Sequence, residues 1–207
     1  MRRHGPHLVG FPLPLTLGAA AALAAALPAA ALEYRRAAVA RGELWRLITC
    51  HWVHWSADHL RWDLLALLAL AWVCQAQWRQ ATAALAAATL AIPLAVAVLQ
   101  PGLSSYRGLS GLCSTLFVLA ACNLLAGPDA PGERAPGDRA ARGGALVSRL
   151  AGALALLLFG GKLVWELSTG NALFVDGAAA GFQPVPLAHL VGGLCGAAAF
   201  RAWRRRP

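Results

Sequence analysis

The feature that most constrains this chain is a series of apolar runs that approach or reach the length needed to cross a lipid bilayer. A spanning helix needs about 20 mostly apolar residues. Apolar residues make up 58% of the 207 positions and charged residues 13%, whereas soluble domains average about 45–50% and about 25%. The sequence therefore predicts an all-α membrane protein, a single domain built as a six-transmembrane-helix bundle. The predicted helices are 9–32, 60–76, 82–99, 109–126, 146–167 and 185–203.

Two further segments bear on this organisation. Residues 127–144 are rich in Gly, Pro, Asp and Arg, which predicts a solvated loop between the fourth and fifth helices. The first run has Arg2 and Arg3 before it and an alanine triplet at 29–31, so it also resembles a cleavable signal peptide. Its apolar stretch is longer than the about 7–15 residues typical of such peptides, which favours a retained first helix.

The basic residues predict the orientation of the bundle. The N-terminus, the second and fourth loops and the C-terminus together carry eleven arginines, whereas the opposite side carries five. An excess of basic residues marks the cytoplasmic side, which places both termini in the cytoplasm. The net charge of +9 comes without a basic stripe interleaved with aromatics, so we expect no nucleic-acid binding. The five cysteines are scattered and form no C-x-x-C pair, which is not the pattern of a disulfide framework or zinc knuckle.

A serine flanked by glycines opens the fourth predicted helix, in the run Gly108-Leu109-Ser110-Gly111. Glycines allow neighbouring backbone to approach the hydroxyl closely. A serine at a helix N-terminus also lies near free N–H groups that can stabilise an oxyanion. Ser110 is therefore a candidate nucleophile. The alternative is a serine that only caps or packs a membrane helix.

A histidine followed by a glycine stripe lies early in the sixth predicted helix. Gly192, Gly193 and Gly196 come three, four and seven residues after His189, so they share its helical face. Small residues on one face permit close helix packing, and an ionisable residue inside a membrane is a candidate functional residue. His189 is therefore a candidate general base. The alternative is a histidine bonded to a backbone carbonyl near the interface.

The predicted topology brings these two residues to one level. The fourth and sixth helices both run from the outer to the inner face. Ser110 and His189 each lie near the start of their helix, hence at a similar depth near the outer side. This agreement predicts a Ser–His dyad, in which the histidine activates the serine hydroxyl.

A third polar cluster precedes the second predicted helix. His59 and Asp63 are one helical turn apart, at the level predicted for Ser110, where a donor can face a developing oxyanion. An alternative is a zinc site formed by His51, His54 and His59 with Asp58 or Asp63. No H-E-x-x-H motif occurs, and zinc leaves Ser110 and His189 unexplained. We therefore expect no metal and no other cofactor.

With these motifs the chain resembles the rhomboid family of intramembrane serine proteases. The resemblance rests on Gly108–Gly111, on the A-H-x-x-G-x-x-x-G run at 188–196 and on the histidine-rich approach to the second helix, and it covers nearly the whole chain. Residues 106–111 and 162–166 are more narrowly similar to rhombosortases. The family implies a Ser–His dyad without a third acid that cleaves membrane-anchored proteins near the outer membrane face.

The rhombosortase resemblance also implies a location and a substrate. It implies a multi-pass protein of a bacterial inner membrane, in contact with the lipid bilayer, with its active site toward the periplasm. It further implies substrates that end in a Gly-rich motif, a membrane helix and a basic tail. The sequence leaves open the cleaved bond, whether the acyl-enzyme goes to water or to another nucleophile, and the oligomeric state. A catalytically inactive, rhomboid-like protein that binds membrane helices is the remaining alternative.

One position departs from the family pattern. Rhomboids carry a histidine and, one turn later, an asparagine at the oxyanion site, but the matching residues here are His59 and Asp63. An ionised aspartate is only an acceptor and opposes oxyanion charge. We therefore expect the Ser110 N–H and His59 to stabilise the oxyanion, with Gly108 and Gly111 shaping the site and the roles of Asp63 and His54 open. Lys162 and Glu166, four residues apart, are interpreted as an ion pair that lowers the cost of burying each charge, or as a snorkelling lysine. The alternative is that they shape the substrate site.

Overall fold

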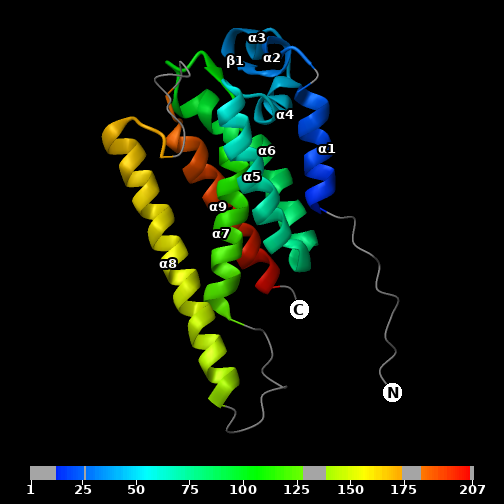
Figure 1. The fold of residues 1–207 in the computed structure, drawn as a ribbon. Coiled ribbons are helices and arrows are strands. Elements are labelled where there is room, and N and C mark those ends of the chain that lie inside the picture. The colour runs from blue at the N-terminus through cyan, green and yellow to red at the C-terminus, as the bar shows by residue number, and fades with distance from the viewer. Residues whose placement is uncertain (1–12, 26, 128–138, 174–182, 206–207) are drawn as a thin grey trace.

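The computed structural model describes residues 13–25, 27–127, 139–173 and 183–205. Over these residues the protein is mostly helical, as the composition predicts. The described part of the chain contains six helices of more than ten residues (Figure 1). They are α1 (Leu13–Ala25), α5 (Ala57–Val73), α6 (Trp78–Leu99), α7 (Ser110–Ala126), α8 (Arg139–Thr169) and α9 (Pro186–Arg204).

Short elements form a cap over one end of the bundle, between α1 and α5 (Figure 1). Strand β1 pairs antiparallel with β2, with Tyr34 opposite Tyr106, so the cap is tied to the loop before α7. The buried Glu33 carboxylate strengthens this tie by accepting from Arg107 at 2.6 Å. The cap consists of α2 (Ala29–Leu32), β1 (Tyr34–Arg35), α3 (Arg36–Ala40), α4 (Arg46–Thr49) and η1 (Cys50–Trp52), and elsewhere lie η2 (Gln75–Gln77) and β2 (Ser105–Tyr106).

Two predicted boundaries are wrong. The segment 9–32 is not one helix within the described residues, because α1 ends at Ala25 and α2 begins at Ala29. Pro28 lies between them in an extended conformation, and proline disfavours a helical residue before it. The loop predicted at 127–144 is also too long, because α8 already begins at Arg139. The part of that loop from 128 to 138 lies outside the described residues.

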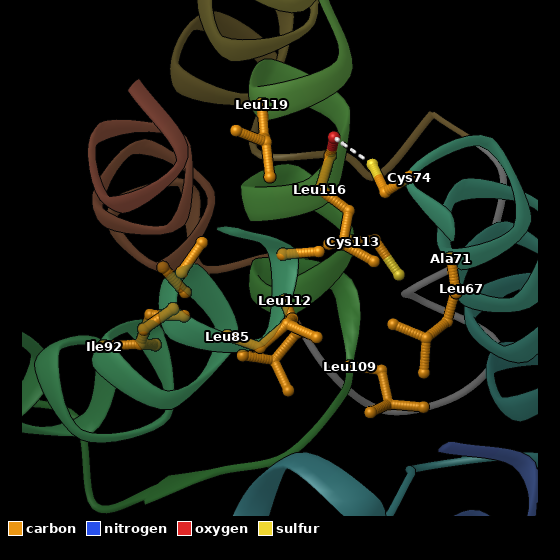
Figure 2. Packing of buried hydrophobic residues seen from close by; sticks show 14 of the residues in the cluster. Leu67, Ala71, Cys74, Leu85, Ile92, Leu109, Leu112, Cys113, Leu116 and Leu119 are labelled. Carbon is orange, nitrogen blue, oxygen red and sulfur yellow. Dashed lines mark hydrogen bonds between the residues drawn. The ribbon is translucent and has the colours of Figure 1, made fainter. Parts of the chain in front are cut away.

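Helix α7 occupies the centre of the bundle and packs against α5, α6, α8 and α9 (Figure 1). Its residues are buried almost all round, which is typical of a uniformly apolar helix enclosed by others. Figure 2 shows buried side chains of α7 packed in one cluster with those of α5 and α6. The labelled residues are Leu112, Cys113, Leu116 and Leu119 of α7 with Leu109 just before it, Leu67 and Ala71 of α5 with Cys74 just after it, and Leu85 and Ile92 of α6.

Helix α8 lies at the edge of the bundle (Figure 1) and leaves most of its apolar surface exposed. Leu150, Leu157 and Leu167 are among its exposed side chains, at 61%, 73% and 73%. Two helical segments of the described chain, Gln75–Leu99 and Gly143–Thr169, are long and apolar enough to cross a membrane by length and composition. Helices α1 and α7 are apolar but shorter.

Candidate active site

The loop before α7 places Ser110 at the first residue of that helix. Gly108 has a φ of 120°, a backbone conformation that side chains other than hydrogen rarely tolerate. Its N–H donates to the Cys50 carbonyl at 3.1 Å. A Cβ at this position would lie 3.2 Å from the His59 ring. Glycine is therefore required here by both the backbone conformation and the close packing.

The structure brings Ser110 and His189 together across α7 and α9. The Ser110 Oγ lies 2.9 Å from the His189 Nε2, the contact that a general base needs to take the hydroxyl proton. His189 is buried, at 5% exposure, in the first turns of α9, and Ser110 is half-buried. The two residues are 79 positions apart in the chain, so the bundle itself creates this pair.

The glycine stripe of α9 makes this approach possible. A Cβ at Gly192 would overlap the carbonyl oxygen of Gly111, and one at Gly196 would overlap that of Thr115. The backbones of α7 and α9 are therefore in direct contact, as small residues on a shared face allow. Gly111 in turn lies against Ile92 of α6 and the carbonyl of Ala188. This packing fixes how far the start of α7 lies from His189.

A carboxylate of α8 contacts the other nitrogen of the histidine. The Glu166 Oε2 lies 2.6 Å from the His189 Nδ1, and the Glu166 Oε1 accepts from the Lys162 Nζ at 2.6 Å. Lys162 and Glu166 thus form the ion pair expected from their spacing, but Glu166 also contacts His189. The sequence motifs did not predict this second contact. The signal in the sequence was an acidic residue within an apolar helix, at the level predicted for His189.

Asp63 is bonded to the loop that carries the nucleophile. Its Oδ2 accepts from the backbone N–H of Leu109 at 2.9 Å. The ring nitrogens of His54 and His59 lie 3.2 Å and 3.3 Å from the same oxygen. Ser56 caps α5 by accepting from the His59 backbone N–H, which sets the turn on which His59 and Asp63 lie. The Asp63 carboxylate therefore bonds directly to the α7 loop, and the rings of His59 on α5 and of His54 before it lie beside the same oxygen.

The first turn of α7 presents backbone donors beside the nucleophile. No hydrogen bond among the described residues uses the N–H groups of Ser110, Gly111 or Leu112. Free N–H groups at a helix N-terminus carry partial positive charge. They are therefore available to an oxyanion that forms at Ser110. His59 lies beside Gly108 and lines the same cleft.

Ser110 and His189 open into a cleft of about 1270 Å³ between α5 and α8. Apolar and aromatic side chains form most of its walls, including Trp62 and Leu65 of α5 and Leu157 and Trp165 of α8. The loop at 102–107 lines it near the cap. The cleft is large enough for a segment of a few residues, since ligand pockets are typically about 300–1,000 Å³.

The histidines of the third cluster do not converge on one point. His51 is fully buried and its Nε2 contacts the Thr89 carbonyl at 3.0 Å, whereas His54 and His59 lie around Asp63. Within the described ranges, no group of three His, Cys, Asp or Glu side chains is arranged to hold a metal ion.

Comparison of the sequence with protein-family models gives no match, and comparison with curated proteins gives none. A serine contacting a histidine that contacts a carboxylate, beside free backbone N–H groups, is an arrangement that can support nucleophilic acyl transfer.

Proposed function

We propose that this protein is an intramembrane serine endopeptidase of rhomboid type, with Ser110 as the nucleophile and His189 as the general base. The observation that carries the proposal is the 2.9 Å contact between the Ser110 Oγ and the His189 Nε2, at the side of an apolar cleft. The apolar cleft distinguishes this pair from a serine–histidine contact on a water-exposed surface, which needs no such cleft.

In this proposal all six long helices span the membrane, with both termini in the cytoplasm. The exposed leucines of α8 support it, because lipid tails cover apolar surface that water does not solvate. Gly111 lies against Ile92, seven residues before the end of α6. Ser110 then lies roughly 10 Å below the outer end of that helix, at about 1.5 Å per residue. Water reaches such a site from the outer face without crossing the bilayer.

The proposed reaction begins when a substrate segment enters the cleft sideways between α5 and α8. The His189 Nε2 takes the Ser110 proton as the Oγ attacks the scissile carbonyl, and the N–H groups at the start of α7 stabilise the oxyanion. The imidazolium then gives this proton to the leaving amine, which departs and leaves an acyl-enzyme. A water molecule, deprotonated by His189, completes hydrolysis and releases a carboxyl product.

We propose membrane-anchored proteins with Gly-rich cleavage regions as the substrates, as the rhombosortase resemblance implies. Each glycine weakens a helix by about 1 kcal/mol relative to alanine. A Gly-rich segment therefore unwinds more easily and presents an extended peptide bond to Ser110. The apolar cleft supports such a substrate, because its walls can cover the apolar, membrane-derived part of the segment.

The test uses the purified full-length protein in detergent with a rhodamine-linked fluorophosphonate, which reacts with activated serines. We expect labelling of wild type at Ser110 and none in Ser110→Ala or His189→Ala. Ser168→Ala removes an exposed serine at the end of α8 and serves as the matched control. A wild-type protein that is folded but unlabelled would instead support an inactive, helix-binding protein, and loss of activity with a chelator would support a metal enzyme.

Cleavage itself is tested by mass spectrometry of candidate proteins that end in a Gly-rich motif, a membrane helix and a basic tail. Cells that express wild type or Ser110→Ala are compared. We expect a truncated C-terminus only with wild type. Equal processing by the Ser110→Ala variant would contradict the proposal.

A further inference from the structure

The His189 Nδ1 contacts two groups of opposite hydrogen-bonding character, an acceptor and a donor. The Glu166 Oε2 lies 2.6 Å from this nitrogen and the Lys162 Nζ lies 2.9 Å from it. A carboxylate only accepts hydrogen bonds and an ammonium only donates them. The Nδ1 has a single in-plane site, which carries either a proton or a lone pair. It therefore bonds to Glu166 or to Lys162, and not to both.

The choice at Nδ1 decides whether His189 can act as a base. If Lys162 donates to Nδ1, a neutral imidazole carries its proton on Nε2, which then faces the Ser110 hydroxyl and cannot take its proton. If Nδ1 carries the proton and donates to Glu166, the Nε2 lone pair faces Ser110 at 2.9 Å. Only the second tautomer is competent for the reaction.

The shorter and charge-assisted bond favours the competent tautomer. Hydrogen bonds to an ionised acceptor are about twice as strong as neutral ones. With a proton on Nε2, the Nδ1 lone pair would instead face a carboxylate oxygen at 2.6 Å without a hydrogen between them. Glu166 is also almost fully buried, at 2% exposure, so no bulk water replaces this partner.

We infer that Glu166 is a positioning residue that completes a Ser110–His189–Glu166 triad and sets the tautomer of His189, and that Lys162 orients the Glu166 carboxylate. This inference rests on the proposed function. It departs from the dyad without a third acid that the family resemblance implies. When His189 accepts the Ser110 proton, the resulting imidazolium contacts the Glu166 carboxylate directly.

Lys162 has a defined part in this arrangement. Its ammonium donates to the Glu166 Oε1 at 2.6 Å, so the Oε2 remains directed at the histidine. The Lys162 side chain is one quarter exposed and lines the cleft, whereas the Glu166 side chain is 1% exposed. The acid of the triad is thus held on α8, the helix that forms one wall of the cleft, by a lysine of the same helix.

The Lys162 contact makes one substitution especially informative. In Glu166→Gln the amide oxygen is the acceptor that the ammonium needs, so the amide NH₂ turns toward the histidine. This donor stabilises the tautomer with its proton on Nε2. In the double variant Lys162→Met/Glu166→Gln, the amide is free to turn its oxygen toward Nδ1–H. The second substitution is therefore expected to restore reactivity that the first one removes.

The experiment measures the rate of Ser110 labelling by the fluorophosphonate in detergent, separated into the maximal rate and the half-saturating probe concentration. For Glu166→Gln we expect the maximal rate to fall at least about 100-fold, since the corresponding acid-to-amide change in a Ser–His–Asp triad costs about 10⁴-fold. The half-saturating concentration should stay unchanged. The double variant should label at least about 10-fold faster than Glu166→Gln.

Two further variants keep the result interpretable. Glu166→Asp retains the charge pair with Lys162 but withdraws the carboxylate from Nδ1 by one methylene, so we expect slow labelling in a folded protein. Glu43→Gln removes a carboxylate that pairs with the buried Arg46 at 2.8 Å, away from the loop before α7. It controls for loss of an arginine–carboxylate pair as such, and it should lower stability without changing the maximal labelling rate.

The outcomes separate the two proposals. The triad is overturned if Glu166→Gln or Glu166→Asp labels as fast as wild type, or if the double variant labels no faster than Glu166→Gln. In either case, labelling of wild type that depends on His189 still upholds the proposed function. Wild-type labelling that does not depend on His189 overturns both. The triad is supported if Glu166→Gln labels slowly at an unchanged half-saturating probe concentration and the double variant recovers a faster labelling rate.

Discussion

The Asp63 carboxylate accepts the backbone N–H of Leu109 at 2.9 Å, so α5 holds the residue that directly precedes the nucleophile. This bond gives Asp63 a role that does not require it to face the oxyanion. Rhomboids, which the sequence resembles, have an amide donor at the matching position, whereas Asp63 acts as an acceptor. Its charge is directed at the loop and at His54 and His59.

We predict that Asp63→Ala destabilises the protein by about 1–3 kcal/mol, because it leaves the buried Leu109 N–H without an acceptor. Asp63→Asn retains an acceptor oxygen and should cost less than half as much. The free energy of unfolding in detergent, measured by denaturant titration, checks both values. Asp58→Ala, an exposed position in the first turn of the same helix, is the control. An equally small effect of Asp63→Ala and Asp58→Ala would refute this role.

Substitution of the α9 stripe should separate the catalytic pair. Gly192→Ala places a methyl group against the carbonyl of Gly111, which forces α7 and α9 apart. A displacement of about 1 Å at a reacting centre can cost about 10²-fold in rate, so we expect a loss of that order in labelling of Ser110. Gly160→Ala on α8, where no atom lies within 4 Å of the added methyl, should label normally. Normal labelling of Gly192→Ala would show that the contact is not needed.

Gly108→Ala should disturb the loop before the nucleophile. Its φ of 120° and the His59 ring 3.2 Å from the added methyl both oppose a side chain. Residues held in such conformations cost on the order of 1–3 kcal/mol. We expect a fall in stability of this size together with slower labelling. Gly102→Ala, in the same loop but with open space around it, is the matched control, and similar behaviour of the two variants would contradict the prediction.

His51 predicts a pH dependence of stability. It lies between α1 and α5, outside the proposed spans, and burial lowers its pKa from 6.5 to about 4. The unfolded chain therefore binds a proton that the folded protein does not, so stability is complete above about pH 6.5 and falls as the pH drops toward 4. The full effect is roughly 3 kcal/mol, at about 1.36 kcal/mol per unit of pKa.

Unfolding measured between pH 7 and 4.5 checks this prediction, because the carboxyl groups contribute mainly below that range. Glu33 is an example, since its pKa is lowered from 4.5 by hydrogen bonds from Arg107 and Arg35 that outweigh its burial. His51→Gln should show a flatter profile than wild type over this interval. Identical slopes for the two proteins would exclude His51 as the source.

Much of the helical framework follows from local sequence. The apolar runs predict α5, α6, α7 and α9 to within a few residues of their observed bounds. The first predicted helix extended too far beyond Ala25, because the prediction followed the alanine-rich run. In the structure Pro28 separates α1 from α2. The start of α8 was wrong because glycines and arginines at 139–144 indicated a loop, whereas the helix continues through them.

The local sequence likewise predicts one part of the candidate site and not the other. The glycines around Ser110 and after His189 mark these two residues in the linear sequence, and their position early in each helix predicts a common depth. That depth follows from chain direction and helix length alone. It does not specify which faces of the two helices meet, so the distance between the side chains was not predictable.

What the sequence determined by itself is the approximate course of most of the long helices and the two candidate reacting residues. Tertiary structure decided that Glu166 contacts the second nitrogen of His189 and that Asp63 holds the loop before Ser110. The physical reason is that both contacts depend on how each helix is rotated about its axis, and packing sets that rotation. Direct backbone contact at Gly192 and Gly196, and the burial of α7 from Gly111 to Leu116, fix it only in the assembled bundle.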